Sequence, residues 1–313
     1  MKPRVAATLL VGALAPALAL ALPRAQETRL HPGEVSPLPS YVGRVEPAIV
    51  GLRVKAAADA ASSARLGAQR FGSGVVFDAR GYAVTVSYIL LDAVTIEAQT
   101  RDNRTVEGRL VGVDFDTGLG VVKLAGTGPW AAAMLGDSRD VRAGAMTGTV
   151  GVDEDNDLVS VAGFVLSIRR FSAYWEYMLD RAFIVSPASP SWGGSALVND
   201  RGQVIGIASL RLGEPPHVNL VIPLEKFLPV KDELIATGRV MSRLPRPWIG
   251  LYTVAVKGGV IVDDVSPLGP ARGAGFVKGD QIIGVDGVGV ASQEEFYERL
   301  WEKRAGDVIR VAV

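Results

Sequence analysis

Short apolar runs, each closed by Gly, Asp or Asn, follow one another at regular spacing from Pro47 to Ile222. Runs of this length are typical of β-strands, and turn residues between them are typical of hairpins. About a dozen such strands with almost no helical periodicity predict a mainly β fold, either a sandwich or a pair of barrels. The content of 36 glycines among 313 residues agrees, because glycine supplies the positive φ that tight turns require.

The charge balance and the composition exclude several classes of function. Lys and Arg together number 33, as do Asp and Glu, so the formal net charge is zero. Nucleic-acid binding and a polybasic membrane patch both need clustered positive charge, and we therefore expect protein or peptide partners and no nucleic acid. Cysteine is absent, which excludes disulfides, thiolate metal sites and a cysteine nucleophile. We expect no metal or other cofactor, because the two histidines, His31 and His217, are distant in the sequence.

The N-terminus has the pattern of an export signal. Lys2 and Arg4 precede an uncharged run from Val5 to Pro23, and small alanine residues lie near the end of this run. We expect cleavage after a signal peptide at residues 1–25, which predicts a periplasmic or secreted protein. The alternative is an uncleaved membrane anchor, since the run approaches the roughly 20 residues that span a bilayer. The protein would contact the membrane only in that second case.

The rest of the chain divides into two domains joined by a proline-containing linker. A polar lead at residues 26–40 precedes the strand-rich region, to which we assign residues 41–238. A helix-like segment at 224–236 closes this region, and residues 239–247 form the linker. The remaining residues, 248–313, predict a small α+β module.

The C-terminal module contains one hairpin signal and one helix signal. Asp286-Gly287 is a preferred two-residue hairpin turn. Ser292 and Glu295 form a capping box at the start of a helix. Phe296 and Leu300 then share one face of that helix, because they are four residues apart.

Five segments of the strand-rich region resemble the trypsin-fold domain of HtrA/DegP serine proteases in order and spacing. They are Gly72–Tyr82, Asp114–Leu119, Leu135–Ser138, Gly193–Asn199 and Gly202–Ile207. Three segments of the C-terminal module resemble the PDZ domain that such proteases carry. They are Trp248–Leu251, Gly269–Ala271 with Ala274–Gly275, and Gly279–Ile283 with Val285–Gly287. The resemblance implies a chymotrypsin-like double β-barrel followed by a PDZ domain, which we expect to stop inside a strand at Val313 and to be minimal or truncated there.

The same resemblance assigns the three positions of the catalytic triad. The family's general base falls on Tyr88, its orienting aspartate on Gly118 and its nucleophilic serine on Gly193. A serine hydroxyl attacks a carbonyl only when an imidazole accepts its proton and a carboxylate orients that imidazole. With all three groups replaced, the resemblance implies a catalytically degenerate member. We expect a pseudoprotease that acts as a scaffold, regulator or chaperone-like protein in quality control of the cell envelope.

An active serine endopeptidase with an atypical or misassigned site is the alternative. Ser191 and Ser195 lie two residues on either side of Gly193 and offer hydroxyl groups. A shift of two residues in an extended segment moves a hydroxyl by roughly 6 Å, and the base and the orienting group would still be absent. We expect His217 and His31 to be exposed residues outside any such site.

PDZ domains bind a partner's C-terminus as an added strand, so the resemblance implies a peptide site in the module. The residues expected to receive the terminal carboxylate are Trp248, Ile249, Gly250 and Leu251. Phe296 and Leu300 either line the apolar pocket for the last side chain or only pack the core of the module. The implied partners are protein C-termini or unfolded polypeptide. The family also implies a homotrimer, or association with an active homologue.

Two further segments each have two interpretations. Asp153–Asp157 is an acidic cluster that forms either a solvated hairpin tip or a calcium site, and it lacks the glycine turn and distal glutamate of a calcium loop. Tyr174, Trp175 and Tyr177 lie where the family has an activation loop. They predict either packing within that loop or an oligomer contact.

Overall fold

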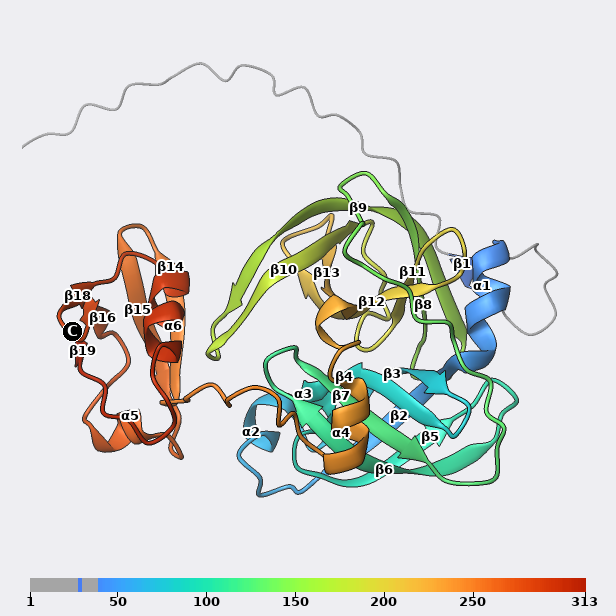
Figure 1. Cartoon of the computed structure of the whole chain (residues 1–313), viewed down its shortest axis with the longest axis horizontal. Helices are drawn as coiled ribbons and strands as arrows, with labels where there is room; N and C mark the ends of the chain where they lie inside the picture. The colour runs from blue at the N-terminus through green and yellow to red at the C-terminus, as the bar shows by residue number, and fades with distance from the viewer. Residues whose placement is uncertain (1–27, 30–38) are drawn as a thin grey trace, which may run out of the picture.

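The computed structural model describes residues 28–29 and 39–313. The signal peptide expected at residues 1–25, most of the polar lead at 26–40 and His31 lie outside the described residues. Two β-barrels are followed by a C-terminal α+β module (Figure 1), which confirms the mainly β, double-barrel prediction. In the described part of the chain, no helix is both long and apolar enough to cross a membrane.

The first barrel is a closed ring of antiparallel strands in the order β2-β3-β4-β7-β6-β5. The strands are β2 (Ile49–Ala56), β3 (Gln69–Asp78), β4 (Tyr82–Val86), β5 (Ala93–Gln99), β6 (Thr105–Asp114) and β7 (Leu119–Leu124). Val75, Val84 and Val121 are fully buried inside it, as β-branched side chains on the inner face of a barrel should be. The flanking short helices are α1 (Ser40–Val45), η1 (Glu46–Ala48), α2 (Ser63–Leu66) and α3 (Ser87–Leu90).

The second barrel is built from β8 to β13 and is closed because β8 pairs with both β9 and β11. The strands are β8 (Met146–Val152), β9 (Leu158–Ala173), β10 (Tyr177–Ser186), β11 (Ala196–Val198), β12 (Val204–Leu212) and β13 (Val218–Pro223). The short strand β1 (Thr28–Arg29) pairs with β9. β9 and β10, with 16 and 10 residues, extend from the barrel as a two-stranded ribbon toward the C-terminal module (Figure 1).

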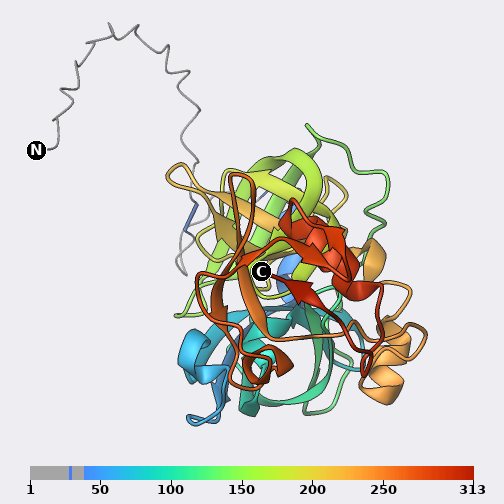
Figure 2. The ribbon, with the colours of Figure 1, turned by 90° about the vertical axis from the view of Figure 1, so that its left-hand side faces the viewer.

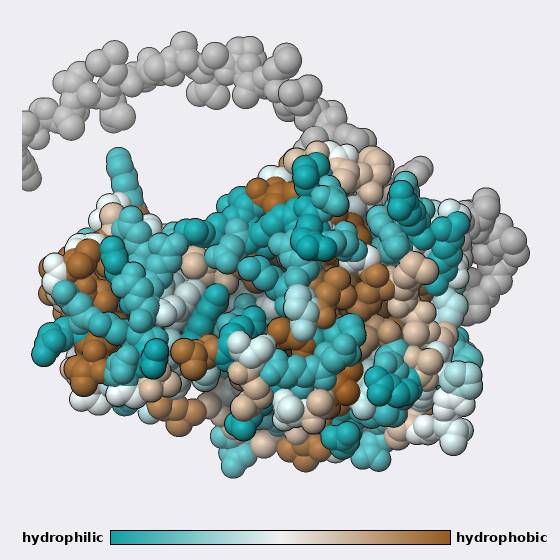
Figure 3. Space-filling view, in the orientation of Figure 1, coloured by the Kyte–Doolittle hydropathy of each residue, from teal (hydrophilic) through white to brown (hydrophobic). Residues whose placement is uncertain are grey.

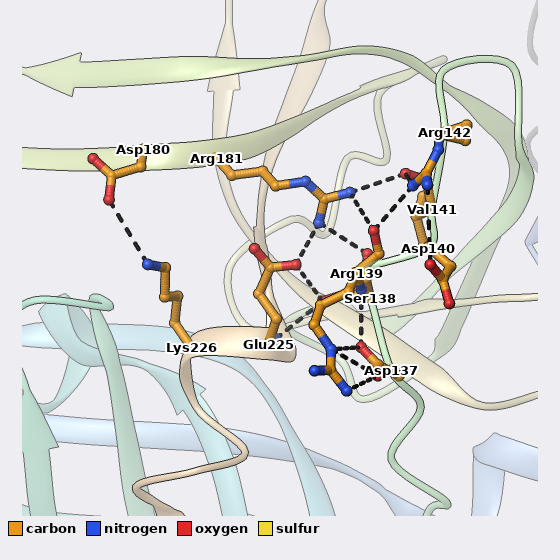
Figure 4. A network of polar contacts seen from close by, with 10 residues as sticks. All are labelled: Asp137, Ser138, Arg139, Asp140, Val141, Arg142, Asp180, Arg181, Glu225 and Lys226. Atoms are coloured by element: carbon orange, nitrogen blue, oxygen red, sulfur yellow. Dashed lines mark hydrogen bonds and ion pairs between the residues drawn. The ribbon is translucent and has the colours of Figure 1, made fainter.

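A polar network fixes β10 to the connection between the barrels (Figure 4). The Arg181 guanidinium on β10 donates to the carbonyl oxygens of Ser138 and Val141, each at 2.9 Å, and forms an ion pair with Glu225. The Ser138 hydroxyl accepts a hydrogen bond from the Glu225 amide at 3.0 Å. Because both charged side chains are largely buried, each needs its partner to remain stable away from water. The network therefore sets the position of the ribbon's second strand.

The segment expected to be one helix at 224–236 is divided in the structure, so that prediction was wrong. The 3-10 turn η2 (Leu224–Lys226) is followed by the helix α4 (Lys231–Thr237), and Pro229 lies between them. Proline has no amide hydrogen, and its ring disfavours helical backbone in the residue before it. α4 ends at Gly238, whose φ of 75° forms the left-handed end cap.

The C-terminal module contains two three-stranded sheets, in the orders β14-β15-β16 and β18-β17-β19. Its elements are β14 (Leu251–Val256), β15 (Gly259–Val265), α5 (Pro270–Gly273), β16 (Gln281–Ile282), β17 (Gly284–Val285), β18 (Val288–Gly289), α6 (Gln293–Trp301) and β19 (Val311–Ala312). The expected hairpin is present, since Asp286 and Gly287 adopt positive φ between β17 and β18. The expected cap is present as well, because the Ser292 hydroxyl accepts a hydrogen bond from the Glu295 amide at 3.1 Å.

The module lies beside the barrels at the end of the β9–β10 ribbon. Figure 2 views the molecule from the module's side, with the module in front of both barrels. Apolar residues are visible on its outer edge (Figure 3), where β18 and β19 lie and Val288 and Val313 are exposed. The opposite side, formed by β14 and α6, contacts the tip of the ribbon through hydrogen bonds of Thr253 and Tyr297.

Candidate functional sites

Tyr88, the position assigned to the general base, lies on α3 immediately after β4. Its hydroxyl donates a hydrogen bond to the Ser209 carbonyl oxygen on β12 at 2.8 Å. Burial raises the pKa of this phenol above its ordinary value, although a side-chain hydrogen bond with Trp192 acts in the opposite direction. The phenol is therefore neutral at physiological pH, and its proton is donated to a backbone carbonyl.

Gly193, the position assigned to the nucleophile, lies next to Tyr88. A Cβ atom built on Gly193 would be 3.0 Å from the Tyr88 hydroxyl oxygen. The Gly193 carbonyl accepts a hydrogen bond from the Ser73 amide at 2.7 Å, which fixes this loop to β3. The fold therefore brings together the two positions that the resemblance assigned to base and nucleophile.

Gly118, the position assigned to the orienting aspartate, closes a turn between β6 and β7. Its amide donates to the Asp114 carbonyl at 2.9 Å, and its own carbonyl accepts from the Ser87 amide, beside Tyr88, at 2.8 Å. A Cβ atom on Gly118 would lie 2.7 Å from the Tyr177 hydroxyl oxygen. That hydroxyl donates to the Thr117 carbonyl at 2.8 Å. An aromatic side chain from β10 thus fills the space in which a side chain at Gly118 would lie.

The serines and the histidine considered for an alternative site are arranged differently. Ser195 is fully buried, and its hydroxyl donates to the Ser191 carbonyl. The His217 imidazole Nδ1 lies 2.6 Å from the Gly213 carbonyl oxygen within its own loop. The Ser195 hydroxyl and the His217 imidazole therefore each have a local backbone partner.

The acidic cluster forms the turn between β8 and β9. The Asp153 carboxylate accepts hydrogen bonds from the amides of Asp155 at 3.1 Å and Asp157 at 2.9 Å. Within residues 28–29 and 39–313, no group of three or more His, Cys, Asp or Glu side chains is placed to hold a metal ion.

The loop Trp248–Leu251 presents two backbone amides to one carboxylate, that of Glu176. The Ile249 amide donates to Glu176 Oε2 at 3.0 Å, and the Leu251 amide donates to Oε1 at 2.7 Å. Gly250 between them has a φ of 84°, and a Cβ atom there would lie 2.7 Å from the Gly269 Cα. The loop is thus a carboxylate cradle that requires glycine at its centre, whereas the Trp248 side chain is 48% exposed beside it.

Phe296 and Leu300 are buried on α6 in one apolar cluster with Ile249 and Leu251. Met178 belongs to the same cluster although it lies on β10 of the second barrel. Phe296 and Leu300 therefore lie in a core that includes a residue from the ribbon, and Leu300 also lines a cavity with Trp248 and Ile249.

Glu176 was not predicted as a site residue from the sequence. It lies in the turn between β9 and β10, where a charged residue is ordinarily solvated, and only the aromatic residues around it mark the segment. Burial raises the pKa of its carboxyl to about 7, although the amides of the cradle favour the charged form. The aromatic segment packs within itself, as one of its two interpretations predicted, because the rings of Tyr174 and Trp175 meet edge to face at 4.8 Å and those of Trp175 and Tyr177 stack at 5.9 Å. It also contacts the module, since the Tyr174 carbonyl accepts a hydrogen bond from the Thr253 amide at 2.8 Å.

Comparisons with known proteins agree with this architecture. Residues 72–207 match the family described as "Trypsin-like peptidase domain", and residues 247–313 match "PDZ domain". The chain is 30% identical over 292 residues to "Serine endoprotease DegS" of Escherichia coli (strain K12), a match that covers 87% of this chain and 80% of that protein.

Solved structures share the fold. "HtrA-type protease AlgW with decapeptide" has a TM-score of 0.55 at 23% identity and covers 87% of this chain and 93% of its own. "Crystal structure of the serine endoprotease from Yersinia pestis" has a TM-score of 0.56 at 27% identity and covers 87% of this chain and 90% of its own. Since the identity to DegS extends over most of both chains and both domain types are matched in order, the chain belongs to the HtrA family of trypsin-like proteins that carry a PDZ domain.

Proposed function

We propose that this chain is a noncatalytic HtrA-family protein of the cell envelope that binds protein C-termini or extended peptides. The observation that carries the proposal is the pairing of Tyr88 with Gly193, in which a phenol that donates to a backbone carbonyl lies beside a residue without a side chain. The export signal expected at residues 1–25 supports the envelope location.

Amide hydrolysis by this fold needs a nucleophile, a base and an orienting group, and the three act as a unit, so that loss of the nucleophile or the base alone costs about as much as loss of all three. Loss of the complete triad removes about a millionfold in turnover in the protease for which it has been measured. Here Tyr177 also occupies the space beside Gly118, so an orienting carboxylate would not fit there without rearrangement. Ser195 is an unsuitable substitute nucleophile, because its hydroxyl is buried and already donates to the Ser191 carbonyl.

The carboxylate cradle supports the binding role. Backbone amides of Ile249 and Leu251 converge on one carboxylate, which is the chemistry that captures a chain terminus in PDZ domains. Peptide capture would let the protein act as a scaffold, a regulator or a chaperone-like holder. A homotrimer and association with an active homologue are both compatible with this role.

Two experiments on the purified chain test the proposal. Labelling with a fluorophosphonate and hydrolysis of casein should both give no signal above a buffer control, and trypsin serves as the positive control. Covalent labelling at Ser191 or Ser195 would instead establish the active-protease alternative.

An array of peptides with free C-termini tests binding, and Gly250→Leu, which fills the cradle, should abolish the signal. Binding that is unaffected by Gly250→Leu would overturn the peptide-site assignment.

A further inference from the structure

The turn of the β9–β10 ribbon holds Glu176 in an unusual backbone conformation. Its φ is 55°, in the left-handed region that residues other than glycine adopt rarely. Such a conformation persists only where surrounding contacts determine it. The contacts that surround Glu176 come from the PDZ domain.

Both oxygens of the Glu176 side chain are used by the cradle. Oε1 accepts from the Leu251 amide and Oε2 accepts from the Ile249 amide, at 2.7 and 3.0 Å. A chain-terminal carboxylate offers the same two oxygens on one carbon, so the Glu176 side chain has the geometry of a terminal group although it lies inside the chain. One cradle does not hold both carboxylates at once.

The backbone of the turn also contacts both β14 and α6, and we call the space between these two elements the groove. The Thr253 amide on β14 donates to the Tyr174 carbonyl at 2.8 Å, as it would to an added strand. On the other side, the Tyr297 hydroxyl on α6 donates to the Ala173 carbonyl at 2.6 Å and accepts from the Glu176 amide at 3.1 Å. The turn therefore contacts both walls of the groove.

Side chains beyond the turn extend this contact. Met178 is buried in the apolar cluster of the module. The Met178 carbonyl accepts a hydrogen bond at 3.3 Å from Arg246 of the linker, whose guanidinium stacks 4.0 Å from the Trp301 ring of α6. A further contact between the ribbon and the module is the ion pair of Arg170 on β9 with Glu298 on α6, at 2.7 Å.

We propose that Glu176 is an internal ligand of the PDZ domain: its carboxylate occupies the cradle, and the ribbon tip closes the groove against C-terminal peptides. The inference rests on the proposed peptide-binding function of the module. An external C-terminus then binds only in molecules whose ribbon tip has left the groove, and its apparent affinity is reduced by the fraction of molecules that are open.

The test compares purified wild-type chain with Glu176→Ala and with Glu107→Ala, which removes an exposed glutamate on β6 of the first barrel. The probe is an array of random decapeptides with free C-terminal carboxylates, beside amidated duplicates, and its strongest binder is titrated by fluorescence anisotropy. We expect Glu176→Ala to bind at least about tenfold more tightly than wild type and Glu107→Ala. Amidated duplicates should bind to none of the three.

Hydrogen–deuterium exchange measures the contact between Glu176 and the cradle in the absence of peptide. The amides of Ile249 and Leu251 should exchange faster in Glu176→Ala than in wild type. The Val262 amide, which bonds to the Asp280 carbonyl at 2.9 Å within the module, should be unchanged and shows that the module remains folded. Glu176→Asp keeps the charge on a shorter side chain and should change peptide affinity and amide exchange in the same direction as Glu176→Ala. If Val262 exchanges faster in Glu176→Ala, the module is destabilised in that variant, and Glu176→Asp is used in its place.

The outcomes separate the two proposals. Equal peptide affinity of wild type and Glu176→Ala, or equal exchange at Ile249 and Leu251, would overturn the internal ligand and leave the peptide-binding function intact. Faster exchange in Glu176→Ala without binding of any free-carboxylate peptide would support the internal contact and overturn the peptide-binding function.

Discussion

The hydroxyl oxygen of Tyr177 lies 2.7 Å from the place where a Cβ atom on Gly118 would be. Gly118 also has a φ of 75°, which strains any other L residue. Gly118→Ala combines both penalties, and we expect it to lower the free energy of unfolding by about 2–3 kcal/mol in urea denaturation.

Gly213→Ala is the matched control for this change. Gly213 has a φ of 77°, and no atom lies within 4 Å of its Cβ position. Only backbone strain applies there, so we expect a loss of about 1 kcal/mol. Equal losses at the two sites would show that Tyr177 does not occupy the space beside Gly118.

Partial restoration of the triad should not restore proteolysis. In Tyr88→His combined with Gly193→Ser, an imidazole and a hydroxyl replace the phenol and the bare backbone, but no carboxylate orients the imidazole. We expect casein hydrolysis by this double variant to be at least about a thousandfold below that of trypsin under the same conditions. Turnover comparable to that of trypsin would contradict the assignment of Gly118 as the third position.

The closed groove should depend on pH through Glu176. Burial raises the pKa of this carboxyl to about 7 in the closed arrangement, whereas the pKa of a solvated glutamate is about 4.3. The closed form therefore binds the proton more tightly, so its stability is complete below about pH 4.3 and decreases as the pH rises through 7. Tyr297, which faces Glu176 from α6, has its pKa raised to about 12 by burial and remains neutral in this range.

We expect exchange of the Leu251 amide, corrected for intrinsic chemistry, to accelerate between pH 5 and 8 in wild type. Glu176→Gln cannot ionise and should give a flat profile over the same interval. Parallel profiles for the two proteins would show that another group controls the groove.

Tyr297→Phe should loosen the contact between ribbon and module. The Tyr297 hydroxyl joins the Ala173 carbonyl, the Glu176 amide and the Thr253 hydroxyl in a buried network. Its removal leaves polar groups without a partner, and we expect a loss of about 1–3 kcal/mol in the free energy of unfolding. Tyr252→Phe on β14, whose ring stacks on Arg65, controls for loss of a phenolic oxygen and should change stability by less than about 0.5 kcal/mol.

Arg246→Ala should open the groove without removing any part of the cradle. Arg246 lies 3.7 Å from the Asp116 carboxylate, stacks on Trp301 and donates to the Met178 carbonyl. We expect the variant to lose about 1–2 kcal/mol in thermal unfolding and to exchange faster at Leu251. Arg239→Ala in the same linker, where the side chain is exposed, is the control. A larger effect of Arg239→Ala would contradict the role of Arg246.

Turns and helix caps were predicted well from the sequence, because they are determined by residues that are close together in the chain. Asp286-Gly287 and the Ser292–Glu295 cap are local in this sense, and both are present in the structure. The wrong prediction of one helix at 224–236 has a local cause too, since Pro229 interrupts the helical backbone between η2 and α4. The proximity of Tyr88 and Gly193 followed only from the family resemblance, because 105 residues separate them in the sequence.

The contact between Glu176 and the cradle could not be predicted. Nothing in the composition of the ribbon tip distinguishes a glutamate that is solvated from one that meets backbone amides 75 residues away. Backbone amides leave no side-chain signature in a sequence, so the carboxylate cradle was expected only through the family resemblance, and its partner Glu176 is visible only once the chain is folded.

Glu176 and Tyr177 are adjacent, and their side chains contact different parts of the molecule. One reaches the PDZ domain, and the other fills the gap beside Gly118 in the first barrel. A single peptide bond therefore joins the residue that contacts the loop Trp248–Leu251 of the PDZ domain to the residue that lies beside Gly118 in the first barrel. Movement of Glu176 out of the cradle would also displace Tyr177 from its place beside Gly118. The dipeptide therefore couples the PDZ domain to the first barrel.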